Sequence, residues 1–178
     1  MMQKSAGRPL GVGLTVLGAL ARVAPHLPNF TPVGGLSLFA GARLRGWRAY
    51  LLPLALMAAT DPLVGGYSFA TPFVYASLLI NVWIGARLLR ATNNPLWIGA
   101  AAGVGSLQFF LISNFGVWLH FPTTYAHTLQ GLATCYLAAL PFYGRTLAGD
   151  LLFSGVLFGL HAWLSRRVMR EQVAAQAV

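Results

Sequence analysis

The chain has 178 residues, of which 57% are hydrophobic and 8% are charged, and its mean hydropathy is +0.66. This composition is typical of integral membrane proteins, and no polar stretch is long enough for a second domain. The net charge of +9 comes from basic residues scattered between apolar runs, without a basic face, which argues against nucleic acid and for loops beside an anionic leaflet. We therefore expect one integral membrane domain over residues 1–178, with short basic tails at 1–9 and 166–178. A single cysteine, Cys135, excludes an internal disulfide and a cysteine metal cluster.

The first apolar run follows Lys4 and Arg8 and contains the sequence ALA at residues 19–21, so the N-terminus resembles a signal peptide. We interpret residues 10–24 instead as a retained first helix. The next stretch, PHLPNFTPVGG at residues 25–35, is neither apolar nor charged. Its prolines predict a connector of fixed shape, and His26, Asn29 and Thr31 add polar groups. It is either a lid over a pocket or a rigid elbow packed on the helices.

Six more apolar runs follow along the chain, which makes seven candidates for what we expect to be six membrane spans. The run at residues 33–44 is short for a full crossing. The run at 128–142 does not cross in the six-span arrangement, and the alternatives are a re-entrant segment or a seventh span. The six runs are 33–44, 50–64, 73–89, 96–112, 128–142 and 146–164.

The distribution of positive charge favours six spans with both termini in the cytoplasm. In that arrangement ten basic residues are cytoplasmic and only Arg22 and Arg145 are outside, whereas seven crossings give eight against four. The expected location is the inner membrane, with multiple passes. The ten expected cytoplasmic residues are Lys4, Arg8, Arg43, Arg45, Arg48, Arg87, Arg90, Arg166, Arg167 and Arg170.

Two aspartates lie at the edge of the apolar runs, on the predicted outer side. A carboxylate in this position is costly and normally has a partner. For Asp61 and Asp150 the candidate cations are Arg22 and Arg145, with His26 or His127 as further partners. Either the aspartates form structural ion pairs or helix caps, with Asp150 one turn into a helix, or they face an outer cavity and bind a ligand.

The segment FFLISNFGVWLHF at residues 109–121 places Asn114 and Trp118 four residues apart, on one face of a helix if the helix continues. With Gln108 nearby, amides and an indole beside aromatic rings are typical of a pocket for a small polar or aromatic ligand. The alternative is an interfacial belt in which Trp118 and Tyr125 anchor the helix end.

Sequence motifs for catalysis or metal binding are scarce. The histidines have no metal-ligand spacing, and the chain has no phosphate loop, nucleophile elbow or metalloprotease motif. We expect no catalytic residue, metal or other cofactor. Small residues recur at four-residue spacing and predict close helix packing, with the first-helix face of Gly11, Thr15 and Ala19 as a candidate docking surface for another subunit.

Several motifs together resemble the DUF6580 family of small bacterial membrane proteins. They are PHLPNFTPVGGLSLFAGA, the isolated Asp61, PFVY at 72–75, SNFGVWL at 113–119, TLQGLATCYLAALPF at 128–142 and TLAGDL at 146–151, and they cover most of residues 22–159. Leu27 stands where this pattern suggests a second proline, and His127 where it suggests an arginine. Such proteins are similar in size and layout to the substrate-binding S components of energy-coupling factor (ECF) transporters. That architecture implies an all-α, six-helix membrane bundle whose first outer loop closes over a small vitamin-like ligand, and which docks to a transmembrane coupling subunit with ATPases.

The leading functional hypothesis is therefore a membrane protein that captures a small molecule from the outer side for uptake. The alternatives are an accessory or structural subunit of a larger membrane complex, and an intramembrane enzyme that uses His26 with Asp61 or Asp150. The expected ligand-binding residues are His26, Asn29, Thr31, Asp61, Tyr75, Gln108, Asn114, Trp118, Tyr125, His127, Arg145 and Asp150.

Overall fold

A computed structural model describes residues 3–24 and 27–176 of the chain. Over these residues the protein is all-α, with six helices and no strand, which confirms the all-α part of the predicted fold class. The helices are α1 (Gln3–Ala21), α2 (Val33–Arg43), α3 (Arg48–Val64), α4 (Thr71–Leu88), α5 (Pro95–His120) and α6 (Leu129–Gln176).

Helix α2 is the centre of the fold. It contacts all five other helices, and ten of its eleven residues are buried. At a rise of about 1.5 Å per residue its length is roughly 16 Å, about half of the ~30 Å hydrocarbon core of a bilayer. The run at 33–44, expected as a span, is therefore a short buried helix, because the other helices surround it.

Glycines allow α2 and α4 to cross at backbone contact. A Cβ atom on Gly41 of α2 would overlap the backbone carbonyl of Val82, and one on Gly85 of α4 would overlap the carbonyl of Leu38. Because neither carbonyl belongs to a flexible side chain, only glycine fits at these two positions. The crossing holds α2 in the middle of the molecule, where its N-terminus helps to form the site described below.

Helix α6 corrects the expected division of the C-terminal half. The runs at 128–142 and 146–164 are parts of one helix of 48 residues that continues through Pro141. Proline removes one backbone hydrogen bond but does not have to end an apolar helix that packs on a neighbour. The segment 128–142 is thus the first part of the last helix, and not a separate re-entrant or seventh segment.

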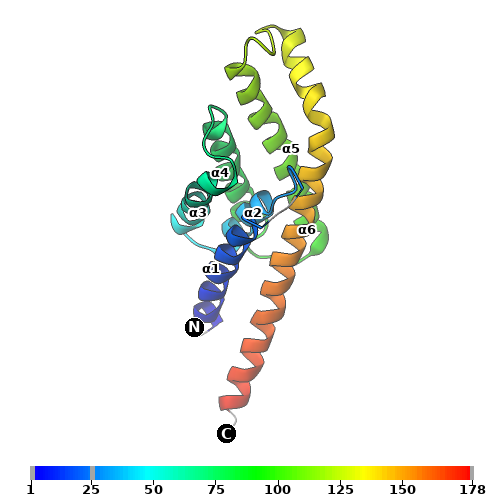
Figure 1. Cartoon of the computed structure of the whole chain (residues 1–178). Helices are drawn as coiled ribbons and strands as arrows, with labels where there is room; N and C mark the ends of the chain where they lie inside the picture. The colour runs from blue at the N-terminus through cyan, green and yellow to red at the C-terminus, as the bar shows by residue number, and fades with distance from the viewer. Residues whose placement is uncertain (1–2, 25–26, 177–178) are drawn as a thin grey trace.

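The basic end of α2 is bonded to the connection between α4 and α5. Arg43, at the end of α2, donates hydrogen bonds to the carbonyls of Leu89 and Thr92 and to Oδ1 of Asn93, in the α4–α5 connection. The start of α1 and the end of α6 share one end of the molecule, and the α5–α6 connection lies at the opposite end (Figure 1).

The face of α1 expected as a docking surface is instead internal. Gly11, Thr15 and Ala19 are all buried, and a Cβ on Gly11 would lie 3.3 Å from the Leu44 side chain. The small residues face inward because α1 packs against α2, α3 and α6.

Two helices, α5 and α6, are long and apolar enough to cross a membrane, with mean hydropathies of 1.6 and 1.5 over the best window. Only 33% and 28% of those windows is buried inside the protein, whereas a core helix of a soluble protein is mostly buried. Leu107, Leu111 and Phe115 of α5 and Leu152 and Val156 of α6 are among the large apolar side chains that face outward. A continuous apolar surface of this kind needs lipid or another protein to cover it.

Candidate functional site

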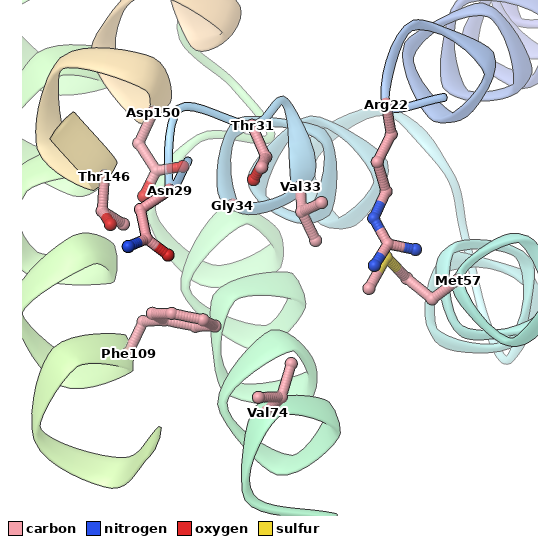
Figure 2. A pocket seen from close by; sticks show the side chains of 10 residues that line it. All are labelled: Arg22, Asn29, Thr31, Val33, Gly34, Met57, Val74, Phe109, Thr146 and Asp150. Carbon is pink, nitrogen blue, oxygen red and sulfur yellow. The ribbon is translucent and has the colours of Figure 1, made fainter. Parts of the chain in front are cut away.

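A cavity of about 170 Å³ lies between the connector that precedes α2 and helices α3 to α6. Figure 2 shows Asn29, Thr146 and Asp150 at one end of it and Arg22 with Met57 at the other, while Phe109 and Val74 line the side away from the connector. The lining residues are Arg22, Asn29, Thr31, Val33, Gly34, Met57, Val74, Phe109, Thr146 and Asp150.

A second cavity, of about 130 Å³, adjoins the first. The two share Asn29, Phe109 and Thr146, and the second extends between α5 and α6 toward Asn114 and Tyr143. Together they reach the lower end of the roughly 300–1,000 Å³ that small-molecule pockets occupy. We refer to the pair as the connector cavities.

The connector is held over these cavities by its own geometry and by α6. Asn29 has a positive φ of 63°, a conformation that asparagine tolerates better than most residues. Phe30 packs on Phe153 of α6 at a ring separation of 5.8 Å. Gly149 of α6 lets the backbone of Thr31 approach, since a Cβ there would lie 3.2 Å from its nitrogen and oxygen. These contacts place Asn29 and Thr31, two of the expected ligand-binding residues, at the cavity wall.

Asp150 caps the N-terminus of α2 from a different helix. Its Oδ2 accepts a hydrogen bond of 2.6 Å from Ser106 of α5, and the backbone N–H groups of Gly34 and Gly35 also donate to the carboxylate. These amides have no partner within α2, whose own N-cap residue, Pro32, offers no side-chain acceptor. A carboxylate here also complements the positive end of the helix dipole.

The Asp150 arrangement corrects two expectations. Asp150 lies far inside α6 and not one turn from a helix start, because the preceding run belongs to the same helix. Its described partners are a hydroxyl and two amides, and not a cation. Gly34 is required beside it, because a Cβ there would overlap the carboxylate.

The other aspartate forms the ion pair that the sequence predicted as one possibility. Arg22 contacts Asp61 Oδ1 at 2.6 Å and also donates to Thr60 Oγ1 at 2.7 Å. The Tyr75 hydroxyl donates to Asp61 Oδ2 at 2.5 Å. Asp61 is buried and does not line either connector cavity, whereas Arg22 lines the first. The network therefore fixes the position of a cavity-wall cation.

The remaining predicted site residues divide between the second cavity and the distant end of α5. Asn114 lines the second cavity, and its amide donates to the Phe110 carbonyl one turn earlier. Gln108 instead bonds to α4, donating to the Ser77 carbonyl and to Asn81 Oδ1. Arg145 is exposed on α6 outside both cavities. His26 lies outside the described residues.

The aromatic end of α5 makes backbone contacts. The helix continues to His120, as the Asn114 and Trp118 spacing required. The Trp118 indole N–H donates to the Ala126 carbonyl at 2.9 Å, and the His127 ring nitrogen contacts the carbonyls of Trp118 and Leu119. These bonds fasten the α5–α6 connection, where Tyr125 also lies, and neither connector cavity includes these residues.

Sequence reasoning missed several residues that shape the cavities. Phe109 and Thr146 line both cavities, and Ser106 orients Asp150. Ser106 and Asp150 are 44 residues apart, and no local pattern marks a serine that serves a distant helix. Phe109 and Thr146 lie in the sequence segments 109–121 and 146–151 that are discussed above. However, the sequence of an apolar helix does not show which way a single aromatic or hydroxyl side chain faces.

Over the described residues, no group of three or more histidine, cysteine, aspartate or glutamate side chains is placed to hold a metal ion. No curated protein and no solved structure shows a significant match to the chain. A family model, described as a family of unknown function (DUF6580), matches residues 4–174. The match spans nearly the whole chain, and the chain therefore belongs to the DUF6580 family.

Proposed function

We propose that this protein is a membrane-embedded substrate-binding protein that captures a small hydrogen-bonding molecule from the outer side, in the manner of ECF S components. The observation that carries the proposal is the pair of connector cavities, walled by the connector and by residues of α5 and α6, with the buried Asp150 carboxylate at their edge.

The outward apolar surfaces of α5 and α6 support a location in the membrane. Arg43, at the end of α2, is bonded to the α4–α5 connection, which supports the placement of these basic segments on the same side of the membrane. The positive-inside rule assigns that side, together with both chain termini, to the cytoplasm. In this orientation the protein is a multi-pass protein of the inner membrane. The short α2 takes the chain through the inner half of the bilayer to Arg43, and the connector enters the outer half from the outside.

The cavity chemistry favours a ligand that both donates and accepts hydrogen bonds. A carboxylate has about four lone-pair sites, and Ser106, Gly34 and Gly35 use three at Asp150. The remaining site can accept from a ligand N–H or O–H. Asn29, Thr31 and Thr146 supply further polar groups, and Phe109 supplies an aromatic face.

The connector is the proposed lid. It carries Asn29 and Thr31, and it is joined to α1, whose following residue Arg22 is tied to α3 through Asp61. Movement of the connector away from Phe153 and Gly149 would open the cavities to the outside. ATP-driven release on the inner side, in the manner of ECF transporters, would require a transmembrane coupling subunit and ATPases, because the sequence has no nucleotide-binding motif.

The proposal is tested by extracting small molecules from the purified protein and identifying them by mass spectrometry. Thr146→Leu removes a hydroxyl from the wall of both connector cavities and narrows them, and Thr134→Leu makes the same change at an exposed site of the same helix. The proposal predicts a small molecule that is enriched with wild type and Thr134→Leu and is depleted from Thr146→Leu. Equal recovery from all three proteins would contradict it.

A second candidate is an accessory or structural subunit of a larger membrane complex. It is favoured by the internal pairing of both aspartates, which gives each a structural role without a ligand. Its test is purification in a mild detergent: a stoichiometric protein partner without any small molecule would favour this candidate over substrate capture. The enzyme alternative depends on His26, which the described residues do not include.

A further inference from the structure

A separate and larger pocket, of about 830 Å³, lies at the basic end of the molecule. It is bounded by the end of α2, the α4–α5 connection, the start of α5 and residues 151–169 of α6. None of its lining residues belongs to the connector cavities. Its two ends differ in chemistry, and we call it the basic groove.

One end of the basic groove is strongly positive. Arg43, Arg90 and Arg166 line it, and no aspartate or glutamate is among the described residues that do so. The guanidinium of Arg43 is held in place by its bonds to Leu89, Thr92 and Asn93 and lies 4.7 Å from the ring centroid of Phe158. Three arginines from three segments thus converge without a carboxylate to neutralise them, which favours an anionic ligand.

Two buried polar atoms at this end have no hydrogen-bond partner within the described part of the chain. They are Nε of Arg43 and Oγ of Ser165, and both residues line the groove. Both groups can donate a hydrogen bond, and leaving a buried donor unpaired is costly. Neither atom is accessible to solvent in this conformation, so a bound anion would reach them after a local side-chain movement, and its acceptor oxygens would then satisfy them.

On α6 the lining residues from Leu151 to Phe158 are apolar, and they extend from Arg43 toward the middle of the helix. Gly155 and Gly159 have no atom within 4 Å of where a Cβ would lie, and Leu151 and Ile98 line the same channel. Leu151 precedes Arg166 by 15 residues, or roughly 22 Å along a helix. An occupant that matches this surface has an anionic head and a long apolar tail.

We propose that the basic groove binds an anionic phospholipid of the cytoplasmic leaflet. The phosphate would lie between Arg43, Arg90 and Arg166, and one acyl chain would lie along Gly155 and Gly159. Basic pockets between membrane helices on this side commonly hold anionic headgroups. The inference rests on the membrane location proposed above and not on ligand capture in the connector cavities.

The test is native mass spectrometry of the full chain in detergent after exposure to phosphatidylglycerol or to phosphatidylcholine. Wild type is expected to retain phosphatidylglycerol preferentially, and Arg90→Ala combined with Arg166→Ala to lower that retention about tenfold. Arg145→Ala removes an exposed arginine of α6 outside the groove and is expected to leave retention unchanged. Retention of both lipids to the same extent, or undiminished retention by the double variant, would overturn the proposal.

Two further experiments are needed. One distinguishes lipid binding from binding of free phosphate, and the other distinguishes binding in the basic groove from binding in the connector cavities. Gly155→Leu fills the apolar channel and is expected to reduce phosphatidylglycerol retention while leaving the arginines in place. Inorganic phosphate that protects the protein against thermal unfolding as well as phosphatidylglycerol does would overturn the lipid assignment in favour of a phosphate site. Thr146→Leu, which narrows the connector cavities, is expected to retain phosphatidylglycerol normally, so failure of the two proposals can be distinguished.

Discussion

The Ser106 hydroxyl of α5 donates a 2.6 Å hydrogen bond to the Asp150 carboxylate of α6, and both residues are buried. Asp150 in turn accepts from the first amides of α2. A single side chain therefore joins three helices at the wall of the connector cavities. The same relationship allows a stability test of the site that does not require the ligand to be known.

Replacing Ser106 with alanine is expected to lower the free energy of unfolding by about 1.5–3 kcal/mol, the range for hydrogen bonds to charged groups. Asp150→Asn is expected to cost at least as much, because an amide nitrogen cannot accept from Gly34, Gly35 or Ser106. Reversible unfolding in mixed detergent measures both changes. Thr134→Ala, which removes a hydroxyl bonded only within its own helix, serves as the control. An unchanged unfolding free energy in Ser106→Ala would contradict the described geometry.

The Arg22–Asp61 pair predicts a large and non-additive effect. Arg22→Met leaves a buried carboxylate without its cation, which typically costs about 3–5 kcal/mol. Arg22→Met combined with Asp61→Leu is expected to be less destabilising than the sum of the single changes, because no charge remains unpaired. A double-mutant cycle of unfolding free energies measures the coupling, and Arg145→Met controls for loss of an exposed arginine. Additive single effects would mean that the two residues do not interact.

The crossing of α2 and α4 predicts opposite effects for the same substitution at two glycines. Gly85→Ala forces a methyl group into the Leu38 carbonyl and is expected to destabilise the protein by about 3 kcal/mol or more. Gly103→Ala, on α5, meets no atom within 4 Å and is expected to stabilise its helix by roughly 0.5–1 kcal/mol. Thermal unfolding of the two variants provides the comparison. Similar melting temperatures would argue against close α2–α4 packing.

The proposed orientation predicts which connections are accessible from each side of the membrane. In a Cys135→Ala background, Ser68→Cys in the α3–α4 connection is expected to react with a membrane-impermeant maleimide in intact spheroplasts. Ala91→Cys in the α4–α5 connection is expected to react only after the membrane is permeabilised. Both positions are exposed in the structure. The reverse labelling pattern would invert the orientation and place the connector on the inside.

The sequence predicted the helical class, most helix positions and Arg22 as one of several candidate partners of the aspartates, because apolar runs and isolated charges are strong local signals. It did not predict that α2 is central, since burial of a short helix depends on the glycine contacts of Gly41 and Gly85 with another helix. It also divided α6 in two, because Pro141 and the polar residues after it resemble a helix boundary.

The candidate site was predicted only in part. Asn29, Thr31, Asn114 and Asp150 line the connector cavities, as their polar character in an apolar chain suggested. Trp118 and His127 share the same motif-rich segments but bond to the backbone of the α5–α6 connection. Sequence spacing shows which residues share one face of a helix. It does not show whether that face lies against a cavity, another helix or a connection, because tertiary packing decides this.

Native mass spectrometry of the protein released gently from its own membranes tests the central claim, that the connector cavities hold a small molecule. Asn29→Gly is the matched variant, because glycine adopts the positive φ of this position while the cavity amide is lost. The account predicts a bound small-molecule mass on wild type that is reduced about tenfold on Asn29→Gly, with unfolding temperatures that agree closely. Wild-type protein without any bound small molecule, or a bound mass that persists undiminished in Asn29→Gly, would contradict it.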